Sequence, residues 1–263
     1  MEPKKNFTLI TGASSGIGLE FARIFAREGH NLILVARSED TLKLLQDELS
    51  KKYSIEVKII VKDLEYYSSP QEIYDETKRE YMNVNILINN AGFGTHGKFI
   101  DTDLDTELKM IQVNITALTH LTKLFLKDMI DNNSGRILNV ASVAAFQPGP
   151  LMAVYYASKA YVLSFSEAIA EELKGTKIRV TTLCPGPVKT NFAQVANASS
   201  IKTFSGKIPS AKEVAEYGYK AMYTNQRVAI HGLKYKTAIQ LIKFIPRKLV
   251  TKLLKKMQEK RNK

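Results

Sequence analysis

The sequence contains no tryptophan, one cysteine and four histidines, and these scarcities exclude several classes of protein. A lone Cys184 cannot form an intrachain disulfide, which favours a reducing compartment such as the cytoplasm. The histidines are scattered along the chain, so no group of His, Cys and carboxylate side chains has the spacing of a metal site. No apolar run reaches 18 residues, and the first run, Phe7–Ile10, is too short for a secretory signal. We therefore expect a cytoplasmic protein with no metal centre and no membrane span.

Acidic residues are also scarce, and the shortage is local. The chain has 38 Lys and Arg against 26 Asp and Glu, a net charge of +12. Residues 232–263 hold eleven of these bases and one acid, Glu259, whereas the preceding 231 residues carry only +2. The basicity therefore belongs to a C-terminal extension. Nucleic acid is not the expected partner, because the basic segment lacks interleaved aromatic residues and no DNA-binding motif appears.

Short apolar runs alternate with amphipathic segments along the chain. Most runs are continuously apolar, as expected for strands covered by helices on both faces of a sheet. The seven expected strands are Phe7–Thr11, Asn31–Ala36, Val57–Lys62, Ile86–Asn89, Arg136–Val140, Ile178–Leu183 and Val228–His231. Capping boxes at Ser69–Glu72 and Ser210–Glu213 predict two helix starts, and long helices are expected over 103–129 and 154–174. This rhythm predicts a single α/β domain over residues 1–231, with a Rossmann-type doubly wound parallel sheet of about seven strands.

A glycine-rich loop, Thr11-Gly-Ala-Ser-Ser-Gly-Ile-Gly18, joins the first expected strand to the first helix. Gly12 permits a tight turn, Gly16 allows the backbone to approach a pyrophosphate, and Gly18 lets the helix pack on the sheet. The helix N-terminus then offers free N–H groups to phosphates. Because the spacing differs from G-x-G-x-x-G, a plain strand–helix turn is the alternative. The strand before and the helix after the loop favour nucleotide binding. The expected contacts are Gly12, Ser14, Ser15, Gly16, Ile17 and Gly18.

The residue after the second expected strand indicates which nucleotide binds. An acid at this position would hold the ribose 2′-OH of NAD, but the sequence has Arg37. A guanidinium group suits a 2′-phosphate through its charge and its forked donors. A solvated arginine at a strand end is the alternative. We expect NADP(H).

The segment from Leu138 to Lys159 carries groups that could deliver a proton. Ser142 follows an apolar run, and Tyr155 and Lys159 are four residues apart, hence on one face of a helix. A phenol is protonated at neutral pH, a nearby ammonium lowers its pKa, and a hydroxyl can donate to a carbonyl oxygen. Tyr156 is a rival phenol, but only Tyr155 lies four residues before the lysine. A strand end and an ordinary i,i+4 surface pair are the alternatives.

Over residues 6 to 231 the chain resembles the short-chain dehydrogenase/reductase family. Six motifs occur in the family's order: Thr11-Gly12-x-x-x-Gly16-x-Gly18, Asn89-Asn90-Ala91-Gly92, Asn114, Ser142, Tyr155-x-x-x-Lys159 and Pro185-Gly186-Pro187-Val188-x-Thr190. Arg37 without a preceding acid is similar to the family's NADP-preferring branch. The resemblance also implies a homodimer or homotetramer built through the two long helices.

The resemblance implies roles for these residues. Asn114, Ser142, Tyr155 and Lys159 would form a catalytic tetrad, with Asn114 holding a water that leads to the lysine. Asp63 and the segment Asn89–Gly92 would lie beside the adenosine of the cofactor, and Lys159 would hold the nicotinamide ribose. The expected further cofactor contacts are Asn90, Ala91, Gly92, Tyr155, Pro185, Gly186, Val188 and Thr190.

Three segments, 93–99, 146–152 and 191–208, are expected to form the substrate lip. Their apolar residues are Phe93, Phe99, Phe146, Leu151, Met152, Phe192 and Phe204, and His96 lies near the site. This lining favours an apolar ketone or ketoacyl substrate, although the aromatics could also only pack the loops. The predicted function is an NADPH-dependent carbonyl reductase or alcohol dehydrogenase with Tyr155 as general acid and base. A catalytically idle NADP-binding redox sensor or a membrane-surface interaction protein is the alternative.

The basic extension predicts a further helix after Pro246. Its apolar residues recur at helical spacing, and basic residues occupy the remaining surface. The apolar stripe consists of Leu249, Val250, Leu253, Leu254 and Met257. Three interpretations stay open: the stripe packs on the domain or a neighbouring subunit, it lies on an anionic membrane, or it docks an acidic carrier such as acyl carrier protein or coenzyme A.

Overall fold

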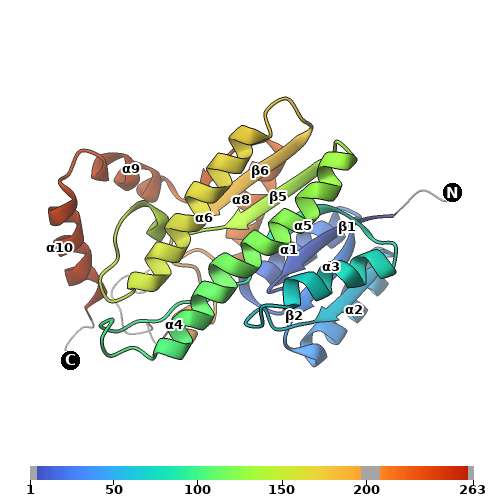
Figure 1. The fold of residues 1–263 in the computed structure, drawn as a ribbon, viewed down its shortest axis with the longest axis horizontal. Coiled ribbons are helices and arrows are strands. Elements are labelled where there is room, and N and C mark those ends of the chain that lie inside the picture. The colour runs from blue at the N-terminus through green and yellow to red at the C-terminus, as the bar shows by residue number, and fades with distance from the viewer. Residues whose placement is uncertain (1–4, 197–207, 260–263) are drawn as a thin grey trace.

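A computed structural model describes residues 5–196 and 208–259, which are built around one parallel sheet (Figure 1). The sheet order is β3-β2-β1-β4-β5-β6-β7, so the predicted Rossmann-type α/β fold with seven strands is confirmed. The strands are β1 (Asn6–Thr11), β2 (Asn31–Ala36), β3 (Val57–Val61), β4 (Asn83–Asn89), β5 (Gly135–Val140), β6 (Ile178–Cys184) and β7 (Val228–Ile230). Each lies within a few residues of its predicted range.

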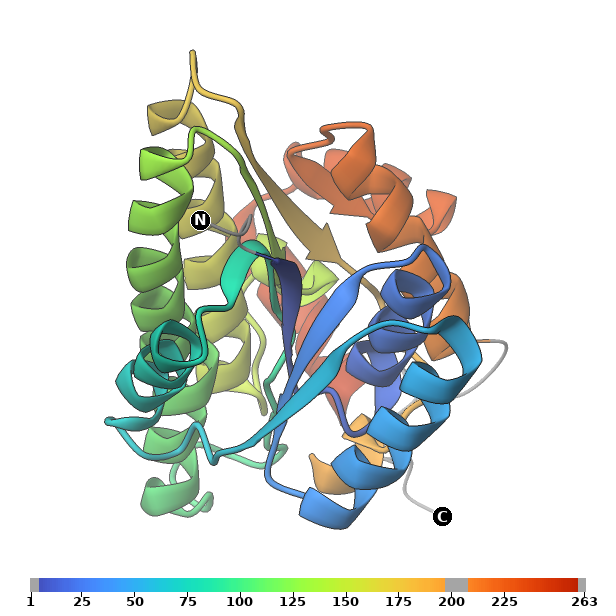
Figure 2. The same cartoon turned by 90° about the vertical axis from the view of Figure 1, so that its right-hand side faces the viewer.

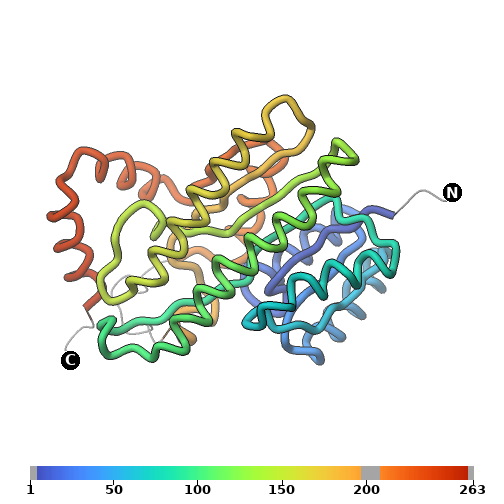
Figure 3. The backbone as a smooth tube through the Cα atoms, in the orientation of Figure 1, coloured from blue at the N-terminus to red at the C-terminus, as the bar shows by residue number. Residues whose placement is uncertain are grey.

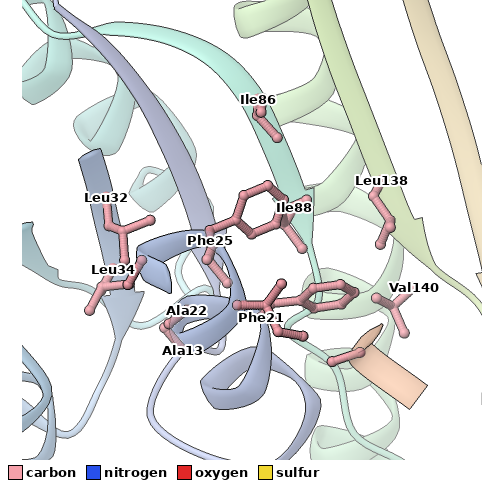
Figure 4. Close-up of a cluster of buried hydrophobic side chains, with 14 of the residues drawn as sticks. Ala13, Phe21, Ala22, Phe25, Leu32, Leu34, Ile86, Ile88, Leu138 and Val140 are labelled. Atoms are coloured by element: carbon pink, nitrogen blue, oxygen red, sulfur yellow. The ribbon is translucent and has the colours of Figure 1, made fainter. Parts of the chain in front are cut away.

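Helices cover both faces of the sheet (Figure 2). One face is covered by α1 (Gly16–Arg27), α2 (Glu39–Tyr53) and α8 (Ala211–Tyr223). The other face is covered by α3 (Ser69–Arg79), α5 (Leu118–Asp131) and α6 (Ala153–Glu172). On the first face, Phe21 and Phe25 of α1 project among the strand residues and are fully buried (Figure 4). Each such ring contributes about 2–3 kcal/mol of burial free energy.

The sheet order places a switch point at the carboxyl end of β1. The chain leaves β1 toward β2 on one side, and returns to β4 on the other side. At such a point the following loops separate to opposite faces and leave a crevice at the carboxyl edge of the sheet. The glycine loop after β1 and the segment after β4 therefore border the same crevice.

The long helix predicted over 103–129 is not continuous. It consists of α4 (Leu104–Ile111), a π-helical segment η1 (Gln112–Ala117) and α5. Asn114 lies inside the π-helical segment and is buried. Its side-chain amide hydrogen-bonds to the backbone of Phe93. A short π-helix inside an α-helix often marks a functional position.

One of the two predicted capping boxes is wrong. At α8 the Ser210 side chain accepts from the Glu213 N–H and the Glu213 carboxylate returns the contact, as predicted. At α3 the N-cap is Ser68, and Ser69 is a buried helical residue whose hydroxyl donates to the Asp63 carbonyl oxygen at 2.6 Å. The Ser69 hydroxyl is thus used in a contact with the preceding loop, and the helix begins at Ser69, one residue earlier than the capping pattern predicts.

The C-terminal extension folds back along the molecule. Helices α9 (Leu233–Ile242) and α10 (Arg247–Gln258) run around the end opposite the N-terminus (Figure 3, red). The predicted apolar stripe divides into two rows. Val250 and Leu254 are buried against the body, whereas Leu249, Leu253 and Met257 are exposed. Within the residues described, the structure has no helix with the length and apolarity needed to cross a membrane.

Candidate active site

A cavity of about 580 Å³ opens at the carboxyl edge of the sheet. It gathers nearly all of the residues singled out in the sequence. The predicted residues that line it are Gly12, Ser14, Ser15, Gly16, Ile17, Arg37, Asp63, Asn90, Ala91, Gly92, Ser142, Tyr155, Lys159, Pro185, Gly186, Val188 and Thr190. Gly18 and Asn114 do not line the cavity but lie behind its wall.

The glycine loop has the backbone that its sequence requires. Gly12 and Gly16 adopt φ values of +65° and +57°, a region that side chains with a Cβ disfavour. At Gly18 a Cβ would lie 2.2 Å from the Gly12 carbonyl oxygen and 2.4 Å from Asn90 Nδ2. Asn90 Nδ2 in turn donates to the carbonyl oxygens of Thr11 at 2.9 Å and Gly12 at 3.3 Å. The loop is therefore closed against β4 at a distance that only glycine permits.

Asn89, expected beside the adenosine, does not reach the cavity. Its side chain is buried and donates to Thr122 Oγ1 at 3.0 Å and to Asn139 Oδ1 at 2.9 Å. Asn139 continues the chain of hydrogen bonds to Ser166 Oγ at 2.8 Å. Because side chains alternate between the two faces of a strand, Asn89 points into the helix layer while Asn90 meets the glycine loop.

The far end of the cavity holds charges of both signs. Arg37 Nη1 lies 3.0 Å from Glu65 Oε1 and 3.5 Å from Asp63 Oδ2. Lys62 also lines this end and pairs with Glu72 at 2.5 Å. Glu65 and Lys62 were missed in the sequence, although both lie within two residues of the predicted Asp63. The two carboxylates therefore offset part of the positive charge of Arg37.

At the other end, Tyr155 and Ser142 form the polar centre of the cavity. Burial raises the pKa of Tyr155 to about 12, and a hydrogen bond with Ser142 opposes part of this rise. Ser142 Oγ also accepts from the Ala144 N–H at 3.1 Å and donates to the Pro185 carbonyl oxygen at 3.4 Å. Tyr155 therefore keeps its proton at neutral pH, the form needed to donate it.

Lys159 is held beside this pair. Its Nζ donates to the Val140 carbonyl oxygen at 2.9 Å and lies 6.0 Å from the Tyr155 ring centroid. Burial lowers the pKa of Lys159 to about 8. We expected the ammonium to lower the pKa of Tyr155, but burial outweighs any such effect in this structure. Desolvation instead moves both groups toward their neutral forms.

Asn114 organises the loop above the lysine. Its Nδ2 donates to the Phe93 carbonyl oxygen and to Ser158 Oγ, both at 3.0 Å, and its Oδ1 accepts from the Phe93 N–H at 3.2 Å. A Cβ on Gly92 would lie 2.9 Å from Asn114 Oδ1 and 3.3 Å from Lys159 Nζ. The amide thus fixes the backbone beside the lysine, and the water relay between them stays a prediction.

Only part of the expected substrate lip faces the cavity. Phe93, Met152 and Phe192 line it, and the Phe192 ring centroid lies 5.3 Å from that of Tyr155. Three predicted lip residues do not line it, because Phe99 and Leu151 belong to surface turns and Phe146 packs near Cys184. Cys184 is fully buried, as expected of a core thiol, and burial raises its pKa to about 12. Phe204 lies outside the described residues.

This geometry agrees with a comparison of the whole sequence with known families. The sequence model of the short chain dehydrogenase family matches residues 6–200, which is most of the chain. The chain belongs to this family.

The chain is similar to curated enzymes that have different names. It is 34% identical over 199 residues to a very-long-chain 3-oxoacyl-CoA reductase from Anas platyrhynchos, covering 73% of this chain and 63% of the relative. It is also 34% identical over 204 residues to 17-beta-hydroxysteroid dehydrogenase type 3 from Mus musculus, covering 75% of this chain and 65% of the relative. The chain thus spans less than two thirds of the length of either relative.

A solved structure with a similar fold is the short-chain dehydrogenase from Sphingobium yanoikuyae in complex with NADPH. Its TM-score is 0.82 at 29% identity, and the alignment covers 94% of this chain and 95% of that one. The likeness therefore extends beyond the sheet to nearly the full length of the chain.

The cavity wall includes a residue that was not predicted from the sequence. Gln258, at the end of α10, lines the cavity, and its Nε2 donates to the Tyr156 hydroxyl at 2.6 Å. Its carbonyl oxygen lies 2.9 Å from His96 Nε2, so His96 contacts α10 and does not line the cavity. The available signal was one glutamine four residues after Leu254, on the buried row of a helix otherwise rich in leucine and lysine.

Helix α9 supports the same cavity from outside. A Cβ on Gly186 would lie 2.3 to 2.9 Å from the ring atoms and hydroxyl of Tyr235. The Tyr235 ring therefore lies flush against the Pro185–Gly186 backbone, which forms part of the cavity wall. The C-terminal extension is thus part of the candidate active site.

Proposed function

We propose that this chain is an NADPH-dependent carbonyl reductase that also runs in the reverse direction as an alcohol dehydrogenase. One observation carries the proposal: Ser142, Tyr155 and Lys159 converge in a cavity whose other end is the glycine loop. A proton donor thus faces the same space as a nucleotide-binding loop, an arrangement suited to carbonyl reduction.

The residues present fit an NADP(H) molecule. The Gly12–Gly18 loop offers backbone N–H groups at the start of α1, and its glycines leave room for a pyrophosphate. Arg37 lines the far end of the cavity, where a 2′-phosphate would find its guanidinium. When bound, the reduced nicotinamide supplies the hydride. The NADPH complex of the Sphingobium yanoikuyae enzyme supports this choice of cofactor.

The chain's own side chains would donate the proton and stabilise the group that loses it. The Tyr155 hydroxyl donates its proton to the carbonyl oxygen as negative charge develops there. Ser142 Oγ turns from its long contact with the Pro185 carbonyl oxygen to donate to the same oxygen. The Lys159 ammonium stabilises the phenolate that remains and holds ribose hydroxyls. In the oxidation direction the phenolate takes the proton back.

The substrate class follows from the cavity lining near Tyr155. Phe93, Met152 and Phe192 form an apolar wall there, which suits an apolar ketone or a 3-ketoacyl chain. The names of the two relatives, a 3-oxoacyl-CoA reductase and a hydroxysteroid dehydrogenase, support both classes.

A substrate screen tests the proposal. We expect the purified chain to oxidise NADPH in the presence of 3-oxoacyl thioesters or steroid ketones, and to leave NADPH intact without them. Tight NADPH binding with no oxidation by any carbonyl compound would contradict the proposal and favour an NADP-binding sensor.

Glu65 is expected to weaken NADPH binding by competing for Arg37. The two side chains form an exposed pair at 3.0 Å, and such pairs contribute about 1 kcal/mol or less. Glu65→Gln should therefore lower the Kd for NADPH about fivefold with little change for NADH. Arg37→Ala should raise the Kd for NADPH by about tenfold or more. Fluorescence titration with both cofactors measures these constants.

A matched control for this prediction is Glu48→Gln. Glu48 pairs with Arg23 at 3.3 Å on the surface, away from the cavity, so its loss should leave both constants unchanged. If Glu65→Gln weakens NADPH binding, Glu65 positions Arg37 and does not compete for it.

The lowered pKa of Lys159 predicts a pH dependence. The pKa of Lys159 lies below the usual lysine value, so the ammonium loses its proton as the pH rises through about 8. The kcat/KM for NADPH, which reports on the free enzyme, should be level from pH 6 to 7.5 and fall about tenfold per unit above pH 8. Tyr155 stays protonated throughout this range. Circular dichroism at each pH verifies the fold, and a level profile to pH 10 would contradict the prediction.

A further inference from the structure

Gln258 lines the cavity and has a buried polar atom with no hydrogen-bond partner among the described residues. The residue is 3% exposed and is anchored twice, through Nε2 to the Tyr156 hydroxyl and through its backbone carbonyl to His96. Its second amide atom, Oε1, is buried and has no hydrogen-bond partner among the described residues. Buried carbonyl oxygens are nearly always paired, so an exception calls for a partner.

The two anchors account for the helix position but not for this atom. To brace α10 against the body, Gln258 needs only its Nε2 and its backbone carbonyl, and this role leaves Oε1 unused. Gln258 lines the cavity, and its buried Oε1 keeps its capacity to accept a hydrogen bond. A prepositioned acceptor of this kind recognises a donor on a ligand.

The surroundings define the chemistry of that donor. Tyr156, whose hydroxyl Gln258 contacts, packs with Met152 and Phe192. Its ring centroid is 6.0 Å from that of Tyr155, so Gln258 lies at the substrate end. Among the described residues that line the cavity, the only acids are Asp63 and Glu65, at the Arg37 end. A cationic donor would therefore find no countercharge among the described lining residues at this end, whereas a neutral donor would find an acceptor in an apolar setting.

We propose that Gln258 Oε1 accepts a hydrogen bond from a neutral donor, a hydroxyl or an amide N–H, carried by the substrate. The inference rests on the proposed carbonyl reductase function and names a feature of its substrate. It also gives the C-terminal extension a role in substrate selection, since α10 supplies the acceptor. A substrate that lacks the donor leaves a buried acceptor unpaired, which is a strong basis for discrimination.

Matched substrate pairs test the proposal. For the amide source, the 3-oxoacyl thioester of N-acetylcysteamine is compared with the ethyl thioester of the same acid. For the hydroxyl source, a hydroxylated cyclic ketone is compared with its deoxy counterpart. Each pair is assayed with the full-length chain and with Gln258→Met, Gln258→Glu and Lys255→Met. Lys255 is an exposed residue on the same helix and serves as the control.

In at least one pair, the wild-type chain should prefer the donor-bearing member by about 10- to 100-fold in kcat/KM. Gln258→Met should reduce this ratio to about threefold or less, whereas Gln258→Glu, which keeps an acceptor, and Lys255→Met should retain it. Because the ratio compares two substrates on one preparation, partial unfolding of a variant does not change it. The pair that responds identifies the donor.

Two results overturn the inference. One is a wild-type chain that turns over both members of each pair equally, and the other is a preference that survives in Gln258→Met. Both results require turnover, so they differ from failure of the proposed function, in which no carbonyl compound leads the wild-type chain to oxidise NADPH.

Discussion

Replacing Tyr155 with phenylalanine is expected to lower kcat for carbonyl reduction about 10³-fold, within the range for loss of a positioned general acid. The substitution removes only the hydroxyl that contacts Ser142, while the ring contacts with Phe192 and Tyr156 remain. The Kd for NADPH should therefore stay within about threefold of the wild-type value, because loss of a transition-state interaction lowers kcat without weakening ground-state binding. Single-turnover kinetics and fluorescence titration separate the two quantities.

Tyr161→Phe is the matched control for this substitution. Tyr161 lies on the same helix, but its hydroxyl meets Thr119 at 2.9 Å at the surface. Its loss should leave kcat unchanged. A Tyr155→Phe enzyme that retained more than about a tenth of the wild-type kcat would assign proton donation to another group.

Gly18→Ala is expected to weaken NADPH binding by about 100-fold or more and to lower the free energy of unfolding by about 1–3 kcal/mol. The new methyl group would lie 2.2 Å from the Gly12 carbonyl oxygen and 2.4 Å from Asn90 Nδ2. Neither atom can move freely, since both belong to the contact that closes the glycine loop against β4. The loop must shift, and its N–H groups then no longer converge on a pyrophosphate.

Gly29→Ala separates the two effects. Gly29 has a φ of +81° with open space around it, so alanine there is strained but meets no neighbour. We expect a loss of about 1–2 kcal/mol in unfolding free energy with an unchanged Kd for NADPH. If Gly18→Ala bound NADPH within threefold of the wild-type value, close packing at Gly18 would not shape the cofactor loop.

Much of the fold was predictable from local pattern. Continuous apolar runs predict buried parallel strands, and all seven occur within a few residues of their expected ranges. The helix details were less predictable. Ser69 has the sequence of a cap but bonds to Asp63, and the helix around Asn114 contains a π-helical segment that no residue pattern announces. In both cases a contact with a residue outside the helix decides the local geometry.

The candidate site shows the same division. The predicted residues that follow strands converge in one cavity because the carboxyl ends of parallel strands share one edge. Asn89 was misplaced, because strand alternation turns it away from its neighbour Asn90. The balance between burial and charge at Tyr155 also required coordinates, since desolvation depends on every group packed around the phenol. Oligomer formation, and contact of the basic extension with a membrane or carrier, stay predictions.

The sequence by itself determined the order of strands and helices, the family and the set of residues around the glycine loop and Tyr155. Periodicity and motif spacing are local properties, and they survive in the sequence without coordinates. Only the tertiary structure decided that α10 contributes Gln258 to the cavity wall and that Arg37 faces Glu65. Gln258 and Tyr156 are 102 residues apart, and Arg37 and Glu65 are 28 apart. Contacts between such distant residues depend on how whole elements pack, which no local pattern records.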